Sequence, residues 1–355
     1  MHNAAMRMLL LTLLLALPAE THWWTVQSTA QSIGADSNLR ALSIYVSQSV
    51  KTIPSPIIWA SGSNGLILRS SDNGTTWQRL HIPNADKLDF RGLQAVDAST
   101  AYAMSIGEAD SSRIYKTTDS GATWTLQYTG NHPTLFLDGL ACISPTHCFA
   151  VSDPVDGKFL LLTTEDGTHW RELPRDHMPA ALPNEGIFAA SNSSLLVTAT
   201  TNEILFATGG PAARVFRSTD LGQTWTVHET PITHANASSG IFSITRVNKT
   251  IIAVGGDYKS TETNVAVAAY SQDDGLTWHL SATQPGGFRS AVTSFDGTNL
   301  TAVGPSGTDV SFDQGVHWQH TDTLNLNALA FAPQLKSGWA AGPKSTIARF
   351  IGRAS

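Results

Sequence analysis

The residues of this chain best suited to binding chemistry are three arginines and a few acidic and aromatic side chains, spread over most of its 355 residues. Arginine holds carboxylates through two parallel hydrogen bonds, so arginines brought together predict a recognition site for an anionic or peptide partner. The acidic residues could instead neutralise the arginines in an internal ion-pair network. Both arrangements remain open for this set: Arg40, Arg91, Arg289, Asp138, Glu185, Asp257 and Tyr258.

Motifs with other known mechanisms are missing from the sequence. It contains no G-x-S-x-G nucleophile turn, no H-E-x-x-H pair, no Walker phosphate loop and no dinucleotide fingerprint. Its two cysteines lack the additional Cys or His at short spacing that a zinc site requires. We therefore predict no catalytic residue, no metal and no cofactor.

An octet of residues recurs six times and sets the period of the chain. The first copy is SSDNGTTW at residues 70–77, and the later copies end at Trp124, Trp170, Trp225, Trp278 and Trp318. The third positions of the first and last copies, 72 and 313, are five repeats apart, so the period is about 48 residues. A β-propeller blade of four short strands needs about this length.

The octet resembles the Asp box of the bacterial neuraminidase repeat, a hairpin turn between the third and fourth strands of a blade. A carboxylate can accept backbone N–H groups across such a turn, the glycine can take a positive φ, and the tryptophan can pack between blades. The resemblance places these turns away from any ligand site. We therefore interpret the acidic third positions as structural, at Asp72, Asp119, Glu165, Asp220, Asp273 and Asp313.

The repeats predict an all-β protein, a seven-bladed β-propeller with four-stranded blades that forms one domain over residues 20–355. Segments 326–332, 337–343 and 346–351 supply only three strands of the seventh blade, and residues 23–29 resemble the missing fourth. The N-terminal strand should therefore complete the last blade. Closing the ring in this way removes the unpaired strand edges that invite aggregation.

The first strand of each blade should line the central axis. Aligning these strands places polar residues at one height, namely Arg40, Arg91, Asp138, Glu185, Ser239, Arg289 and Asn327. The longer loops between the second and third strands, such as 152–159 and 255–264, lie at the same end of the strands, and the octets lie at the other. Because loops on a rigid scaffold commonly carry binding residues, we expect function on the first face.

Residues 1–19 are predicted to be a signal peptide that is cleaved near Ala19. An apolar run at 8–16 follows Arg7 and is too short to span a bilayer. Export would place the two cysteines in an oxidising compartment. Cys142 and Cys148 flank a predicted hairpin turn and are therefore expected to form a local disulfide, with two buried free thiols as the alternative.

The charge balance argues against two classes of partner. The chain has 22 Lys and Arg against 28 Asp and Glu, a net charge of −6, and no run of basic residues. Nucleic acids and anionic membrane surfaces both require a basic footprint. We therefore predict neither nucleic-acid binding nor direct membrane insertion of the mature chain.

The chain resembles the photosystem II stability/assembly factor family of seven-bladed propellers. The resemblance is carried by LDFRGLQAVD at 88–97, FRSAV at 288–292, IIAVGGDY at 251–258 and GWAAGPKSTIARF at 338–350, together with the octets. It implies a monomeric, non-catalytic, exported scaffold that contacts a protein partner, such as a membrane protein complex, through the face bearing the arginines. The location would be the periplasm or the extracellular space, or the thylakoid lumen in a photosynthetic organism.

Two other functions remain as alternatives. The Asp box also occurs in sialidase-like glycoside hydrolases, in which an arginine cluster grips the substrate carboxylate and a tyrosine with an acidic partner acts as nucleophile. Tyr258 and Glu185 could form such a pair, although the Phe/Tyr-Arg-Ile-Pro motif of sialidases is absent. The second alternative is a glycan- or peptide-binding propeller without an assembly role.

Overall fold

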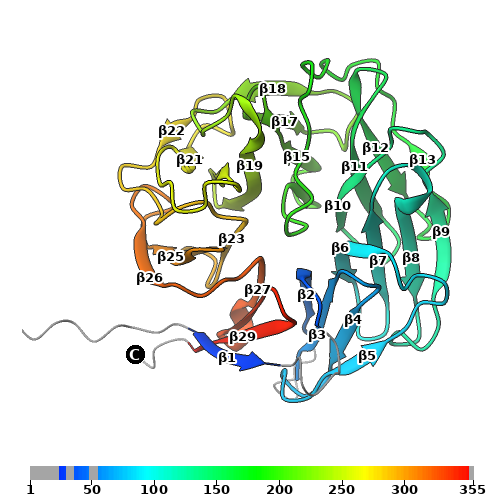
Figure 1. Cartoon of the computed structure of the whole chain (residues 1–355). Helices are drawn as coiled ribbons and strands as arrows, with labels where there is room; N and C mark the ends of the chain where they lie inside the picture. The colour runs from blue at the N-terminus through cyan, green and yellow to red at the C-terminus, as the bar shows by residue number, and fades with distance from the viewer. Residues whose placement is uncertain (1–23, 29–35, 48–54, 352–355) are drawn as a thin grey trace, which may run out of the picture.

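The computed structural model of the chain describes residues 24–28, 36–47 and 55–351, which form a ring of seven antiparallel sheets (Figure 1). This confirms the predicted seven-bladed β-propeller with four-stranded blades. The predicted signal segment 1–19 lies outside the described residues.

Blades one to three follow one another along the chain. Blade one consists of β2 (Leu39–Tyr45), β3 (Ile57–Gly62), β4 (Ile67–Ser70) and β5 (Gln78–Leu80). Blade two consists of β6 (Asp89–Ala95), β7 (Ala101–Ile106), β8 (Arg113–Thr117) and β9 (Thr125–Thr129). Blade three consists of β10 (Leu137–Cys142), β11 (Cys148–Val155), β12 (Lys158–Thr164) and β13 (Arg171–Glu172).

Blades four to six continue the ring. Blade four consists of β14 (Leu195–Thr198), β15 (Glu203–Ala207), β17 (Arg214–Ser218) and β18 (Thr226–Glu229). Blade five consists of β19 (Asn236–Val247), β20 (Thr250–Asp257), β21 (Ala268–Ser271) and β22 (His279–Leu280), with the short β16 (Gly209–Gly210) added at its inner edge. Blade six consists of β23 (Ala291–Ser294), β24 (Leu300–Gly304), β25 (Gly307–Ser311) and β26 (Gln319–Asp322). The short 3-10 helices η1 (Ala109–Ser111) and η2 (Pro333–Leu335) lie in blade two and blade seven.

Blade seven joins the two ends of the chain. It consists of β27 (Ala328–Ala332), β28 (Ser337–Ala341), β29 (Thr346–Ile351) and the N-terminal strand β1 (Trp24–Ser28). β1 runs antiparallel to β29, with Trp24 opposite Phe350 and Ser28 opposite Thr346. The predicted closure of the ring by the N-terminal strand is therefore confirmed.

The apolar core is divided among the interfaces between neighbouring blades. Between blades one and two, for example, the fully buried Trp59 packs in one cluster with Ile67, Phe90 and Leu93. The octet tryptophan Trp124 joins this cluster and meets Trp59 edge to face at 6.0 Å. As predicted, the octet places a tryptophan between blades.

The acidic residue of the octet organises its turn through local hydrogen bonds. In the first octet, Asp72 accepts from the Thr76 backbone N–H at 2.9 Å and from its hydroxyl at 2.6 Å, while Gly74 takes a φ of 76°. The bonds from Thr76 lower the pKa of Asp72 to about 2. Equivalent backbone bonds, from the residue four positions later, are accepted by Asp119, Asp220, Asp273 and Asp313.

The third octet departs from the prediction, because Asp166 and not Glu165 holds its turn. Asp166 accepts from the backbone N–H groups of Thr168 and His169 at 2.8 Å and lies 2.7 Å from Nδ1 of His169. Glu165 instead pairs with Arg171 at the surface. The anchoring hydroxyl, on Thr164, is two residues before Asp166 as in the other octets. The hydroxyl and the acid are thus displaced by one residue while Gly167 keeps its octet position, so the turn is one residue shorter.

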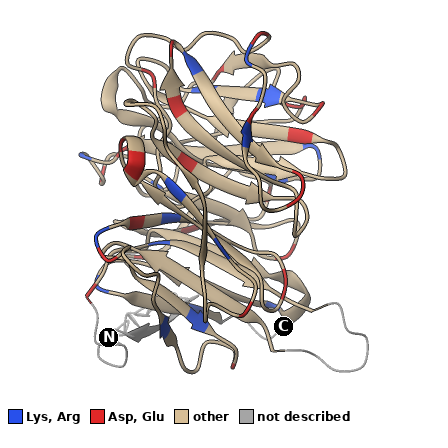
Figure 2. Ribbon diagram, turned by 90° about the vertical axis from the view of Figure 1, so that its right-hand side faces the viewer, with Lys and Arg blue, Asp and Glu red and all other residues tan. Residues whose placement is uncertain are grey.

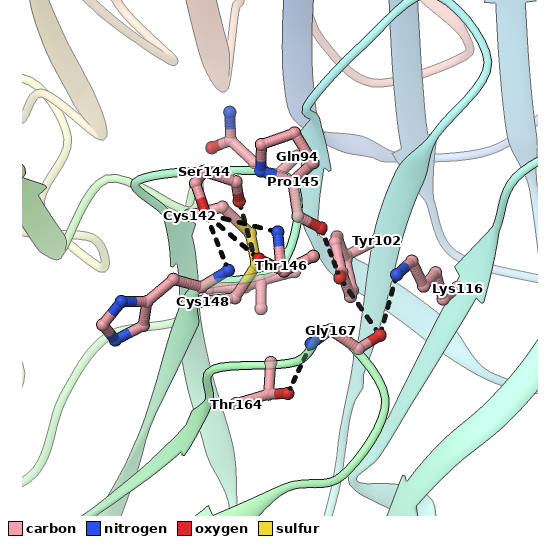
Figure 3. The surroundings of a disulfide bond; sticks show 12 residues. Gln94, Tyr102, Lys116, Cys142, Ser144, Pro145, Thr146, Cys148, Thr164 and Gly167 are labelled. Carbon is pink, nitrogen blue, oxygen red and sulfur yellow. Dashed lines mark hydrogen bonds between the residues drawn. A yellow bond between two sulfur atoms is a disulfide. The ribbon is translucent and has the colours of Figure 1, made fainter.

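Cys142 and Cys148 are joined by a disulfide across the turn between β10 and β11 (Figure 3). The two residues stand directly opposite each other in the strand register, which is why their side chains can meet. Hydrogen bonds from blade two also stabilise the turns at this end of blade three. The Tyr102 hydroxyl donates to the carbonyl oxygens of Pro145 and Gly167, and Lys116 donates to that of Gly167 at 2.8 Å.

Candidate functional site

In four of the seven blades, a bulge in the innermost strand aims one side chain at the axis. The strand register skips Arg40 in β2, Arg91 in β6, Asp138 in β10 and Phe242 in β19. A skipped residue has no partner opposite it, so a bulge turns its side chain out of the regular alternation. All four line one cavity of about 510 Å³.

The cavity lies at the end of the ring that carries the loops between second and third strands. Ser290 and Asn327, which precede β23 and β27, continue the circle of lining residues in blades six and seven. Tyr258 and Pro305 reach it from the loops that follow β20 and β24. The cavity is therefore on the face where we expected function, opposite the octets.

Residues 187–194 close the central channel beneath this cavity. They precede β14 and bond across the axis to other blades: the Ser191 hydroxyl donates to the Ser290 carbonyl at 2.7 Å, and that of Ser193 to the Ser243 hydroxyl at 2.7 Å. Residues 187–190 line the cavity, whereas residues 191–193 line a smaller one of about 190 Å³. We call residues 187–194 the plug.

Arg40 is a half-buried cation without an acidic partner. Within the described residues, no carboxylate lies at ion-pair distance from it, and its guanidinium lies beside the Asn38 amide at 3.0 and 3.1 Å. Burial, with a smaller contribution from the positive charge of Arg91, lowers the pKa of Arg40 to about 10, and the negative charge of Asp89 only partly opposes this shift. At neutral pH the guanidinium is still charged, so it is available to an anion in the cavity.

Arg91, in contrast, is fully engaged. Its Nε and Nη2 lie 2.8 Å from Oδ2 of Asp89, and its Nη1 donates to the Ala189 carbonyl of the plug at 3.0 Å. These bonds fix the guanidinium between β6 and the plug. Arg91 therefore shapes the cavity wall and is not a free anion-binding group.

Two carboxyl groups face the cavity from blade three. Asp138 is fully buried, and neither of its oxygens has a hydrogen-bond partner among the described residues. Asp153, at the end of β11, accepts from the Ile187 N–H of the plug at 2.8 Å. Burial raises the pKa of Asp153 to about 6, and burial together with the negative charge of Asp153 raises the pKa of Asp138 well above its usual range.

Aromatic rings form another part of the wall. Phe188 of the plug stacks on Phe242 with ring centroids 3.8 Å apart, and Tyr258 meets both rings edge to face. Phe288 packs against Phe242 at 4.6 Å. The Tyr258 side chain is 47% exposed, so this aromatic group reaches from the plug to the mouth of the cavity.

Three residues of the predicted site do not face the cavity. Arg289 is fully buried in blade six, where its Nε donates to Asp309 at 2.5 Å. Glu185 is buried against Arg214, with 2.8 Å between Oε1 and Nε, and so does not pair with Tyr258 as the sialidase alternative requires. Asp257 binds the Asn236 amide and the Lys259 backbone N–H outside the cavity lining. The predicted cluster of three arginines is therefore not formed.

The positions predicted to share one height differ from those in the structure where the innermost strands begin irregularly. The residues equivalent to Arg40 are Ser290 in place of Arg289 and Phe242 in place of Ser239, while in blade four the plug replaces the start of the strand. A shift of one residue sends a strand side chain to the opposite face, which is why Arg289 lies inside the blade.

A small residue in the second strand of a blade marks the position of the residue that faces the cavity. A glycine or serine stands opposite the residue that precedes each bulge, at Gly62, Ser105, Ser152 and Gly255. An added Cβ would lie 2.2 Å from the Asn38 carbonyl oxygen at Gly62 and 1.9 Å from the Gly240 carbonyl oxygen at Gly255. From blade two onward, the glycine or serine follows the cavity residue by 13 to 15 positions, except in blade four.

Asp153 and the plug were not predicted as part of the site. Asp153 belongs to a loop that was singled out, 152–159, but its approach to Asp138 depends on the pairing of β10 with β11. The plug carries no motif. Its position follows from hydrogen bonds to four other blades.

The described residues contain no helix long and apolar enough to cross a membrane, and no cluster of three or more potential metal ligands. On the side of the ring drawn in Figure 2, basic and acidic residues are interspersed, without a large region of one sign. This distribution agrees with the low charge bias of the sequence.

The sequence profile of the DUF6242 beta propeller domain matches residues 60–299, which is more than half of the chain. The chain belongs to the DUF6242 beta propeller family. No curated protein matches this DUF6242 propeller in sequence.

Solved structures similar to the DUF6242 propeller include two of YCF48. One is YCF48 bound to D1 peptide, at 12% identity and a TM-score of 0.64, with 94% of this chain and 98% of that chain covered. The other is YCF48 from Cyanidioschyzon merolae, at 16% identity and a TM-score of 0.63, covering 93% and 99%. YCF48 is a photosystem II assembly factor. The resemblance to assembly-factor propellers is thus confirmed for the fold.

Proposed function

We propose that this protein is a non-catalytic binding propeller that holds a carboxylate-bearing peptide segment of a protein partner in the cavity of about 510 Å³. The observation that carries the proposal is Arg40, a charged guanidinium that faces this cavity and has no acidic partner within the described residues. A buried or half-buried charge is normally paired, and a ligand carboxylate would supply the missing partner.

The size of the cavity favours a short segment over a folded surface. Pockets of about 300 to 1,000 Å³ are typical of ligands that are largely enclosed. A chain end or a few extended residues would fit such a space, with apolar side chains against Phe242 and Tyr258. The structural neighbour YCF48 has been solved with a D1 peptide bound, which supports a peptide as the ligand class.

An exported scaffold that assists a protein complex is the cellular role we propose. The apolar segment at residues 8–16 and the disulfide between Cys142 and Cys148 both support an oxidising compartment outside the cytoplasm. The partner would present the carboxylate-bearing segment to the cavity face of the ring.

Fluorescence anisotropy with peptides tests the proposal. A library of random hexapeptides with free carboxyl termini is first selected on the purified protein, and the selected peptides are then compared with their C-terminal amides. If a charged hydrogen bond is worth about 1.5 to 3 kcal/mol, amidation should weaken binding by about tenfold or more. Arg40→Gln should weaken binding of the acid form to a similar extent and leave binding of the amide unchanged.

Arg79→Gln is the matched control, because Arg79 is an exposed arginine on the outer strand β5. It should leave the affinity unchanged, and both variants should keep the circular dichroism of the wild type. The proposal fails if the protein selects no peptide, or if the acid and amide forms bind equally to wild type and to Arg40→Gln.

A further inference from the structure

A carboxyl group that lines the cavity has no hydrogen-bond partner among the described residues. Within the described part of the chain, Asp138 is the one carboxyl group with both oxygens buried and without a partner. Burying such a group costs free energy unless something in contact with it supplies donors. Asp138 lines the cavity while its side chain is shielded from solvent, so a donor to it must come from a molecule held inside the cavity.

Asp153 adds a second carboxyl group at the same place. It lines the same cavity, and one of its oxygens is held by the Ile187 N–H. The two side chains come from neighbouring strands and interact electrostatically, since Asp153 disfavours the charged form of Asp138. Two acidic groups in one enclosed space favour a positively charged partner between them.

The protein itself does not provide that partner. The positive charge of Arg91 acts on Asp138, but the Nε and both Nη atoms of Arg91 are already bonded to Asp89 and Ala189. The described residues also contain no group of three metal ligands, and two carboxylates alone are a poor cation cage. An organic cation fits the site better, because aromatic rings such as Phe136 line the same cavity and attract such groups.

We infer that Asp138 and Asp153 form an acidic subsite that binds one alkylammonium or guanidinium group of the ligand. The inference rests on the proposed function for the peptide nature of the ligand, and it adds that the bound segment carries a lysine, an arginine or an amino terminus as well as its carboxylate. Arg40 would take the negative group, and the acidic subsite would take the positive one. The N–H donors of the cation would satisfy the oxygens of Asp138.

Ligand-observed NMR titration with two small probes tests this inference separately from the proposed function. The probes are Nα-acetyl-lysine methylamide and its uncharged isostere Nα-acetyl-norleucine methylamide, neither of which has a carboxylate. Wild type should bind the lysine compound about tenfold or more tightly than the norleucine compound. The preference should increase from about pH 5 to pH 8, because the cation binds the ionised form of the carboxyl pair.

Asp138→Asn and Asp153→Asn, singly and combined, should reduce the preference to about twofold or less. Asp156→Asn is the matched control, because Asp156 is exposed on the loop that follows β11 and its φ of 53° suits asparagine. This control and Arg40→Gln should both retain the preference for lysine.

Equal binding of the two probes to wild type, or binding of neither at millimolar concentration, overturns the inference without needing any variant. A lysine preference that survives in the double variant overturns it as well. Failure of the proposed function is recognised independently. That function is tested by the affinity difference between acid and amide hexapeptides and by the effect of Arg40→Gln on it.

Discussion

The side-chain amide of Asn192 bonds to both backbone groups of Leu140, accepting from its N–H at 2.8 Å and donating to its carbonyl at 2.9 Å. Leu140 lies in β10, an innermost strand whose edge toward the axis has no neighbouring strand. The amide of Asn192 therefore satisfies this edge as a further strand would. In this way the plug from blade four is fastened to blade three.

Asn192→Ala should lower the free energy of unfolding by about 2 kcal/mol, measured by urea denaturation. The substitution removes the two hydrogen bonds to Leu140, each worth about 1 kcal/mol, and a longer one to the Leu93 carbonyl at 3.4 Å. It also leaves alanine at a φ of 63°, which is unfavourable for residues with a Cβ. Asn202→Ala isolates the backbone contribution, because Asn202 is exposed at a φ of 50°. An equal loss in both variants would contradict a fastening role for the Asn192 side chain.

Asp309→Asn should lower the free energy of unfolding by about 3 kcal/mol or more. Arg289 and Asp309 are both fully buried, so the variant leaves an unpaired charge inside blade six. Arg171→Gln, which breaks the exposed pair with Glu165, should cost at most about 1 kcal/mol. If Asp309→Asn is no more destabilising than Arg171→Gln, Arg289 must find another partner, and its assignment to the blade interior is wrong.

Asp166→Ala should lower the melting temperature, whereas Glu165→Ala should leave it almost unchanged. Asp166 accepts the backbone bonds that hold the third octet turn, and Glu165 makes only a surface ion pair. Bonds from His169 and Thr168 also lower the pKa of Asp166, so its contribution should disappear only in strong acid. Differential scanning fluorimetry of the two variants distinguishes them, and the reverse order would restore Glu165 as the acid of this octet.

Asp153→Asn should gain stability relative to wild type as the pH rises from about 4 to 7. A carboxyl whose pKa is raised from 3.8 to about 6 on folding favours the folded state at low pH, and that contribution is lost as the pH rises through about 6. The difference is at most about 3 kcal/mol, from 1.36 kcal/mol per pKa unit. Asn cannot ionise, so the variant lacks this loss.

Unfolding curves at several pH values provide the measurement, with Asp156→Asn as an exposed control that should follow the wild type. Asp138 contributes in the same direction, because its pKa is also raised. A constant difference between Asp153→Asn and wild type over this pH range would show that Asp153 is ionised without cost in the folded protein.

The sequence alone determined the architecture, because the signals for it are local and repeated. Each octet encodes its own hairpin turn through bonds between residues at most four positions apart, as between Asp72 and Thr76. Six such turns at one period define the blades, and the apolar segments on either side define their strands. The match between residues 23–29 and a missing fourth strand was enough to predict the closure by β1.

Only the tertiary structure decided which side chains meet in the cavity. Side chains alternate along a strand with a period of two, so one residue of difference places Ser290 in the cavity and Arg289 inside a blade. The plug and the pairing of Glu185 with Arg214 depend on contacts between segments far apart in the chain. Asp138 and Asp153 likewise meet because β10 pairs with β11, and no local pattern encodes the cavity that they share.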